Sequence, residues 1–166
     1  LRRGVPGAGT VSGDVLIVAV GAFCSLALDT ADRLSQQGIA ATVVDPRWVL
    51  PVPGSIVGLA RTHRLVVTLE DGGISGGVGS AVAAAVSAAD LVVPVQQRGI
   101  PQEFIEMGSR GEVLAELGLT AQDLARSITA TVSRMQSIPE LGDDALADAP
   151  ADQAADSRTA DSHADD

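Results

Sequence analysis

The residues that could do chemistry lie in one stretch, Leu69 to Val82, which reads LEDGGISGGVGSAV. It places the adjacent carboxylates Glu70 and Asp71 and five glycines between an apolar run and a helix-like segment. Many α/β proteins hold a phosphate at such a junction, because the first N–H groups of a helix have no partner within the helix. The stretch could therefore be a phosphate site, an acid/base site or a turn.

Neither common phosphate-binding template fits the stretch. The dinucleotide template G-x-G-x-x-G fails at Val82, which stands where the third glycine is required. The P-loop template fails at Val78, which stands where the lysine is required. Glu70 and Asp71 would also repel an anion just before the helix. These residues disfavour a phosphate site.

The two carboxylates could instead form an acid/base pair. Consecutive residues that leave a strand point in opposite directions, whereas a working pair must converge on one substrate. We therefore expect Glu70 and Asp71 to act locally, as acidic groups at a strand end that face backbone N–H groups. The glycines, Gly76 and Gly77 among them, then supply positive φ angles and a close approach of helix to sheet.

Histidine and cysteine offer little further chemistry. His63 lies between two arginines near a predicted helix end, and no Ser or Cys is spaced to complete a triad with it, so a structural role is favoured. Cys24 is expected to be a small buried or half-buried residue. One cysteine and one histidine outside the C-terminal tail cannot build the usual zinc shells. We assign no catalytic, cofactor-binding or metal-ligating residue.

Arg47 and Trp48, in DPRWVLP, are harder to dismiss. They follow the carboxyl end of a predicted strand, which is the edge where open α/β sheets place ligands. Arg47 could hold an anion there, and an exposed Arg-Trp pair is also typical of a domain or subunit interface. The sequence leaves both alternatives open.

Composition argues against several classes of protein. The net charge of −10 and the scarcity of aromatic residues argue against a nucleic-acid partner. Most of the negative charge falls in 137–166, which carries −8, while 1–136 carries −2. A lone cysteine fits a reducing cytosol, and no signal peptide or membrane-spanning run is visible. We expect a cytoplasmic protein without nucleic-acid or membrane partners.

Apolar, β-branched runs alternate with helix-like segments. Strands are expected over 15–20, 41–44, 64–69 and 91–95, and helices over about 23–37, 55–63, 78–89, 109–118 and 120–135. Ser55 is expected to cap the second helix, and Thr120 with Asp123 the last one. Gly38 is a predicted helix stop, and Pro94 indicates an edge strand. The alternation predicts an α/β fold: a three-layer open sheet, mostly parallel, with helices on both faces.

The ordered domain is predicted over 14–136. Residues 1–13 combine Gly, Pro and Ser and are interpreted as an interdomain linker. Residues 137–166 hold too few large hydrophobes to offset their ordering entropy and are interpreted as a disordered acidic tail. The chain begins with Leu1 and not with methionine, which suggests a piece of a longer polypeptide.

In this order, the segments DVLIVAVGAF, GIAATVVDPRWVLPVP, HRLVVTLEDGGISGGVGSAV, GIPQEF and SRGEVLAELGLTAQDLARSI resemble the C-terminal domain of the 1-deoxy-D-xylulose-5-phosphate synthases. The resemblance covers Asp14 to Met135. The Gly-rich loop alone is also similar to transketolases and to the beta subunits of 2-oxo acid dehydrogenases. The resemblance implies a transketolase C-terminal-like fold within a thiamine-diphosphate enzyme.

The resemblance also implies partners. In the family, thiamine diphosphate and Mg²⁺ are held by an N-terminal and a middle domain, so we expect neither to bind this chain alone. The expected partners are those two domains of the same polypeptide and a homodimer partner. Candidate interface residues are Arg47, Trp48, Glu70, Asp71, Gly76 and Gly77. The alternatives are the matching domain of another transketolase-like or 2-oxo acid dehydrogenase enzyme, or a stand-alone interaction module.

Overall fold

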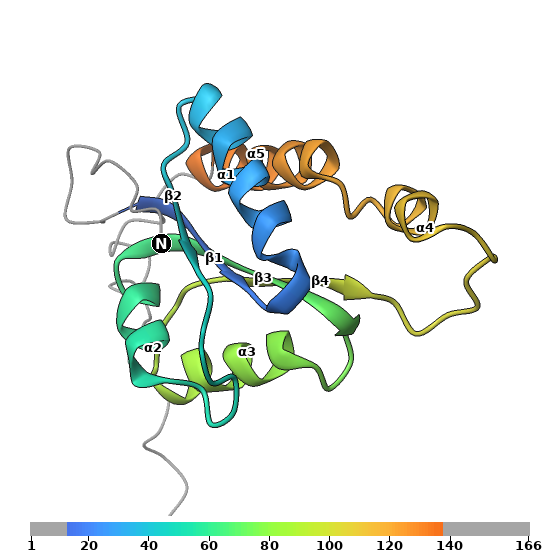
Figure 1. The fold of residues 1–166 in the computed structure, drawn as a ribbon. Coiled ribbons are helices and arrows are strands. Elements are labelled where there is room, and N and C mark those ends of the chain that lie inside the picture. Colours follow the sequence, from blue (N-terminus) through green and yellow to red (C-terminus); the bar gives the residue numbers. More distant parts are fainter. Residues whose placement is uncertain (1–12, 138–166) are drawn as a thin grey trace, which may run out of the picture.

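The computed structural model describes residues 13–137, which form one four-stranded sheet with helices on both faces (Figure 1). The strands are β1 (Gly13–Ala19), β2 (Ala41–Val44), β3 (His63–Gly73) and β4 (Val95–Ile100). The helices are the 3-10 helix η1 (Gly21–Phe23), α1 (Cys24–Gln36), α2 (Gly54–Ala60), α3 (Val78–Ala88), α4 (Arg110–Glu116) and α5 (Ala121–Ser137). The order is β2-β1-β3-β4 and every neighbouring pair is parallel, which confirms the predicted fold class.

The central strands β1 and β3 are apolar along most of their middle part, where both of their faces are covered. Along β1, Val15 and Ile17 pack into a cluster with α1 and α5, while Leu16 and Val18 pack into a second cluster with α2 and α3. Figure 1 shows the same division, with α1 and α5 on one side of the sheet and α2 and α3 on the other. Alternate side chains of a strand point to opposite faces, so a continuous apolar run is the pattern that such a strand requires.

The two long helices lie against the sheet through the faces that their periodicity predicts. Ala27, Ala31 and Leu34 of α1 are buried, and Gly38, with φ +76°, ends that helix as expected. On α5 the buried residues are Leu124, Ala125, Ile128 and Val132. The Asp123 N–H donates to the Thr120 hydroxyl at 3.2 Å, which confirms the predicted cap.

The predicted fourth strand is wrong in position. The strand is Val95–Ile100, not 91–95, and it pairs only with β3, so the edge position indicated by Pro94 is correct. Val92, in the segment before β4, is fully exposed. The Pro94 carbonyl in the same segment accepts a hydrogen bond from the N–H of Val66. Unlike β2, the other outer strand, which is buried along its length, β4 is only partly buried, so it can carry polar residues such as Gln96, and an apolar run is then a poor guide to its position.

Two other predicted boundaries need correction. Ser55 does not cap α2, because the helix begins at Gly54 after Pro53, without a side-chain cap. The N–H of Ile56 instead donates to the Pro53 carbonyl at 2.9 Å. Strand β3 runs on through Gly73 beyond the predicted end at Leu69, with an irregularity in its pairing to β4 after Leu69. Part of the Gly-rich stretch is therefore strand and not loop.

The predicted linker and the predicted acidic tail lie outside the described residues, apart from Gly13, which opens β1, and Ser137, which ends α5. Within 13–137, none of the helices has the length and apolar character needed to cross a membrane.

Helix α4 begins with a capping box that the sequence analysis overlooked, although the pattern Ser109-x-x-Glu112 carries it. The Ser109 hydroxyl and then its backbone N–H donate to the Glu112 carboxylate, at 2.7 and 2.9 Å. These bonds hold the pKa of Glu112 below its ordinary value. The stabilisation they give is therefore present above the unfolded-state pKa and is lost as the pH falls through the lowered one.

We expect Ser109→Ala to raise the pKa of Glu112 toward its ordinary value, because the hydroxyl bond is the larger cause of the lowering. The measurement is an NMR titration of the Glu112 carboxyl carbon. Ser133→Ala, an exposed serine on α5, is the matched control and should leave that titration where it is. A Glu112 titration unchanged by Ser109→Ala would contradict the assignment.

Candidate functional site at the carboxyl edge of the sheet

Glu70 turns from the end region of β3 toward the start of α3. Its Oε2 accepts a hydrogen bond from the N–H of Val78 and its Oε1 one from the N–H of Gly79, each at 2.8 Å. The residue is only 6% exposed. A negative charge at these otherwise unpaired amides is favourable in the field of the helix. This confirms the predicted local role of Glu70, and the carboxylate occupies the amides that a phosphate would need.

Glycines give Glu70 the room it needs. A Cβ on Gly77 would collide with the Glu70 carboxylate and lie 2.5 Å from the Gly73 carbonyl oxygen. A Cβ on Gly99 of β4 would lie 2.8 Å from the Gly72 carbonyl and 3.1 Å from the Glu70 side chain. Gly76 has φ +74°, a conformation that favours glycine. The stretch therefore contains both the positive φ and the close approach that were predicted.

Asp71 points away from Glu70 and pairs with Arg110 at the first turn of α4. The guanidinium holds both carboxylate oxygens, at 2.8 and 3.2 Å. It also lies 5.7 Å from the centre of the Phe23 ring, within range of a cation–π contact. The adjacent carboxylates diverge, as expected, and cannot act together on one substrate. The prediction that Asp71, like Glu70, faces backbone N–H groups is wrong, because its carboxylate pairs with the Arg110 side chain. The sequence analysis missed Arg110, because a partner 39 residues away leaves no local signal.

Arg47 and Trp48 lie in the loop after β2 with their side chains exposed. Trp48 is 72% exposed, and Arg47 makes no ion pair with any residue of 13–137. The loop after β4 carries two further exposed apolar residues, Phe104 and Met107, that the sequence analysis did not single out. Their segment, PQEFIEMG, matches neither strand nor helix periodicity. Large apolar residues in a segment without such periodicity could have indicated an exposed apolar loop.

His63 is an internal structural residue at the start of β3. Nδ1 lies 2.7 Å from the Leu59 carbonyl, and Nε2 lies 2.9 Å from the Thr42 hydroxyl. A carbonyl oxygen can only accept, so Nδ1 donates to Leu59, while Nε2 shares a hydrogen bond with the Thr42 hydroxyl. Both nitrogens are thus engaged within the fold, and the ring is 3% exposed.

Cys24 is half-buried at the start of α1. Burial, together with a hydrogen bond to Asp45 and the charge of that residue, raises the pKa of its thiol. The nucleophilic form of cysteine is the thiolate, which these surroundings disfavour. Among residues 13–137 no group of three or more His, Cys, Asp or Glu side chains is placed to hold a metal ion.

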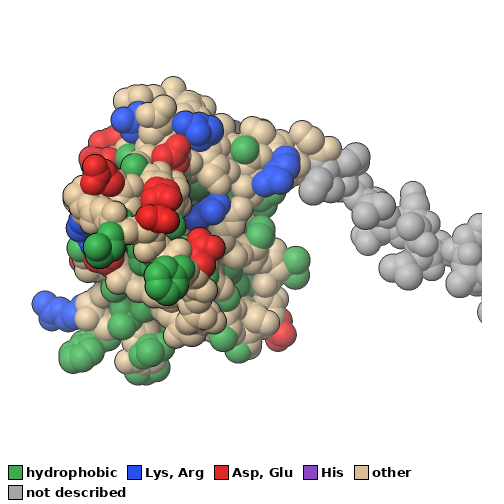
Figure 2. All heavy atoms as spheres, turned by 90° about the vertical axis from the view of Figure 1, so that its right-hand side faces the viewer, with side chains coloured by type: hydrophobic (Ala, Val, Ile, Leu, Met, Phe, Trp, Pro, Cys, Tyr) green, Lys and Arg blue, Asp and Glu red, His purple; other side chains and the backbone are tan. Residues whose placement is uncertain are grey.

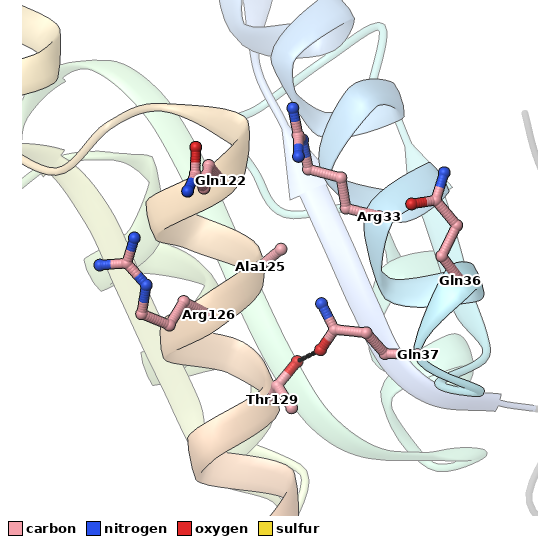
Figure 3. A pocket seen from close by; sticks show the side chains of 7 residues that line it. All are labelled: Arg33, Gln36, Gln37, Gln122, Ala125, Arg126 and Thr129. Carbon is pink, nitrogen blue, oxygen red and sulfur yellow. Dashed lines mark hydrogen bonds between the residues drawn. The ribbon is translucent and has the colours of Figure 1, made fainter.

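A groove of about 360 Å³ runs between α1 and α5, on a helical layer of the molecule and away from the carboxyl edge (Figure 3). It is lined by Arg33, Gln36, Gln37, Gln122, Ala125, Arg126 and Thr129. The Thr129 hydroxyl and the Gln37 side chain are hydrogen-bonded across it at 2.6 Å, and Arg126 pairs with Asp123. The lining offers no nucleophile and no acid/base pair.

Comparison with known proteins agrees with this geometry. The family model described as transketolase, C-terminal domain matches residues 10–124. A curated 1-deoxy-D-xylulose-5-phosphate synthase of Mycobacteroides abscessus is 57% identical over 130 residues, which are 78% of this chain and 20% of the relative. One of Rhodococcus jostii is 56% identical over 142 residues, 85% of this chain and 22% of the relative. The chain thus spans about a fifth of the length of these relatives.

Solved structures share the fold. A structure titled as a split gene transketolase in an inactive beta4 tetramer is 35% identical, with a TM-score of 0.65 over 75% of this chain and 42% of that one. A transketolase of Pichia stipitis with xylulose 5-phosphate is 21% identical, with a TM-score of 0.55 over 75% of this chain and 17% of that one, and shows the fold alone. The family match covers more than half of the chain, and the parallel sheet agrees with it. The chain belongs to the family of transketolase C-terminal domains.

Proposed function

We propose that this chain is the C-terminal domain of a 1-deoxy-D-xylulose-5-phosphate synthase. The observation that carries the proposal is the 57% identity over 130 residues to the Mycobacteroides abscessus synthase. The whole enzyme would join pyruvate to glyceraldehyde 3-phosphate with loss of carbon dioxide. The product, 1-deoxyxylulose 5-phosphate, is a precursor of isoprenoids and thiamine.

The domain supports the enzyme structurally and does not catalyse the reaction alone. Glu70 is committed to the start of α3, Asp71 to Arg110, and both nitrogens of His63 to the fold. The start of α3 does not fit the diphosphate of thiamine diphosphate, because Glu70 already occupies the amides that would receive it. We assign the binding of thiamine diphosphate and its Mg²⁺ to the domains that precede this one.

The proposed partners are those upstream domains of the same polypeptide and a second copy of the enzyme in a homodimer, in the cytoplasm. Of the candidate interface residues, Arg47, Trp48, Asp71 and Gly76 are exposed, although Asp71 is paired with Arg110. These positions are open to a neighbouring domain. Glu70 and Gly77 would act on an interface only through the shape of the loop.

The test is a domain exchange. The C-terminal fifth of the Mycobacteroides abscessus synthase is replaced by residues 1–166, and formation of 1-deoxyxylulose 5-phosphate is measured. We expect kcat/KM within about tenfold of the parent, a difference of about 1.4 kcal/mol in transition-state free energy. The parent truncated before this domain and the isolated chain should both be inactive.

The control is the parent enzyme with its own C-terminal domain religated at the same junction. An inactive exchange protein beside an active control would contradict the proposal, as would turnover of pyruvate by the isolated chain. Activity restored to a truncated transketolase, and not to the synthase, would favour another transketolase-like enzyme. A folded chain that associates with neither would favour a stand-alone interaction module.

A further inference from the structure

Exposed apolar side chains are concentrated on two loops at one edge of the sheet. Six large hydrophobic residues of the described chain are strongly exposed: Leu28, Trp48, Leu50, Val92, Phe104 and Met107. Four of these lie on the loops that leave β2 and β4, and Phe104 and Met107 are fully exposed. Single exposed hydrophobes are ordinary, whereas a gathering of large ones indicates a contact surface.

The topology brings the two loops to the same edge. All strands are parallel, so their carboxyl ends meet at one edge of the sheet, and β2 and β4 are its outer strands. The loops 45–53 and 101–108 therefore flank that edge, with the Gly-rich turn and the Asp71–Arg110 pair between them. Figure 2 views the molecule from the right-hand side of Figure 1, toward which β4 runs, and shows hydrophobic side chains interspersed with charged ones.

The side chains of loop 101–108 indicate what kind of surface would bind the loop. Phe104 and Met107 alternate with Glu103 and Glu106, all four of them exposed. Burying a Phe or Met side chain is favourable, and within their own domain Phe104 and Met107 gain nothing from burial. A complementary surface would offer apolar pockets for Phe104 and Met107, with basic groups at its rim for the two glutamates.

We propose that loops 45–53 and 101–108 form one docking surface for the upstream domains of the same polypeptide, with Trp48, Phe104 and Met107 as its anchors. This rests on the proposed function. The chain spans about a fifth of its curated relatives and matches a family described as a C-terminal domain, so most of the polypeptide would precede it. Glu70 and Gly77 shape the turn between the two loops from inside the fold.

The upstream domains suit this surface better than a second copy of the chain does. A stable complex of separate proteins buries about 800 Å² on each partner, more than a few side chains on two loops supply. A domain linked in the same polypeptide meets its neighbour at a millimolar effective concentration and needs less contact area.

The experiment compares amide hydrogen exchange in two proteins. One is the exchange protein, which is the synthase whose C-terminal fifth is replaced by residues 1–166, and the other is the isolated chain 1–166. In the exchange protein we expect amides of 101–108 and 45–53 to exchange at least about tenfold more slowly than in the isolated chain, because docking closes them. The double variant F104S/M107S should restore fast exchange and lower the activity of the exchange protein. In the isolated chain it should leave the thermal midpoint unchanged, since both side chains are exposed there.

Val92→Ser is the matched control, because Val92 is equally exposed but lies before β4, at the other end of the strand. It should alter neither exchange nor activity. Loops that exchange equally fast in both proteins would overturn the docking surface, as would an isolated chain that dimerises in light scattering and loses the dimer in F104S/M107S. Protected loops in an inactive exchange protein would support the surface while the proposed function fails.

Discussion

Replacing Glu70 with alanine is expected to lower the free energy of unfolding by roughly 2–4 kcal/mol, because two buried or half-buried amides lose their acceptor at once. The carboxylate accepts from Val78 and Gly79, and no other acceptor for those N–H groups lies within the helix. The negative charge of Glu70 also interacts favourably with the positive end of the α3 dipole, and the loss of this interaction adds to the cost. Urea denaturation of the full chain measures the difference.

The neighbouring carboxylate supplies the control. Asp71→Ala breaks a surface ion pair with Arg110, whose side chain is 56% exposed, and such pairs contribute about 0–1 kcal/mol. Glu70→Gln keeps the size of the side chain and one acceptor oxygen, so it should fall between the two. The loss in Glu70→Ala should be local first, seen as faster hydrogen exchange at the Val78 and Gly79 amides. A cost no greater than that of Asp71→Ala would show that Glu70 does not hold the helix.

Strands β1, β2 and β3 could be predicted from the sequence because each is marked by an apolar run within its own segment. A strand covered on both faces is apolar at most positions, and VLIVAV, ATVV and RLVVTL follow this pattern, with Thr42 and Thr68 as buried exceptions. Strand β4, which is only partly buried, follows a different pattern. In β4, Gln97 faces the α3 side and bonds Ser80, while Gln96 faces α5 and bonds Thr131, so neither side chain needs to be apolar. The apolar run 91–95 was the stronger signal, and it led to the wrong position for the strand, which is Val95–Ile100.

The candidate site was predictable in part for the same reason. Adjacent residues on a strand diverge, so the separation of Glu70 from Asp71 follows from local geometry. Their partners do not follow from it. Arg110 and Gly99 reach the turn from other elements, and only the folded chain brings them there. The apolar residues of loop 101–108 are distinguished by exposure, which is a property of the fold and not of the segment.

The second large effect on stability is expected at Gly77. Packing and backbone freedom predict changes of opposite sign there when alanine replaces the glycine. Its φ of −78° is open to any residue, so an alanine there should by conformational entropy alone stabilise the protein by about 0.4–1 kcal/mol. The added Cβ, however, would meet the Glu70 carboxylate and lie 2.5 Å from the Gly73 carbonyl oxygen. Overpacking of this kind costs roughly 1–3 kcal/mol, so we expect Gly77→Ala to destabilise the chain in urea denaturation.

Two comparisons make that expectation specific to Glu70. Gly58→Ala, within α2, adds a Cβ with no heavy atom within 4 Å and should stabilise by about 0.5–1 kcal/mol, opposite in sign to Gly77→Ala. In the Glu70→Ala background one of the two collisions disappears, so Gly77→Ala should cost less there than in the native chain. Equal costs in both backgrounds would mean that the carboxylate and the glycine do not pack as one unit. A smaller cost would show that the absent side chain at 77 is what lets a buried carboxylate cap the helix.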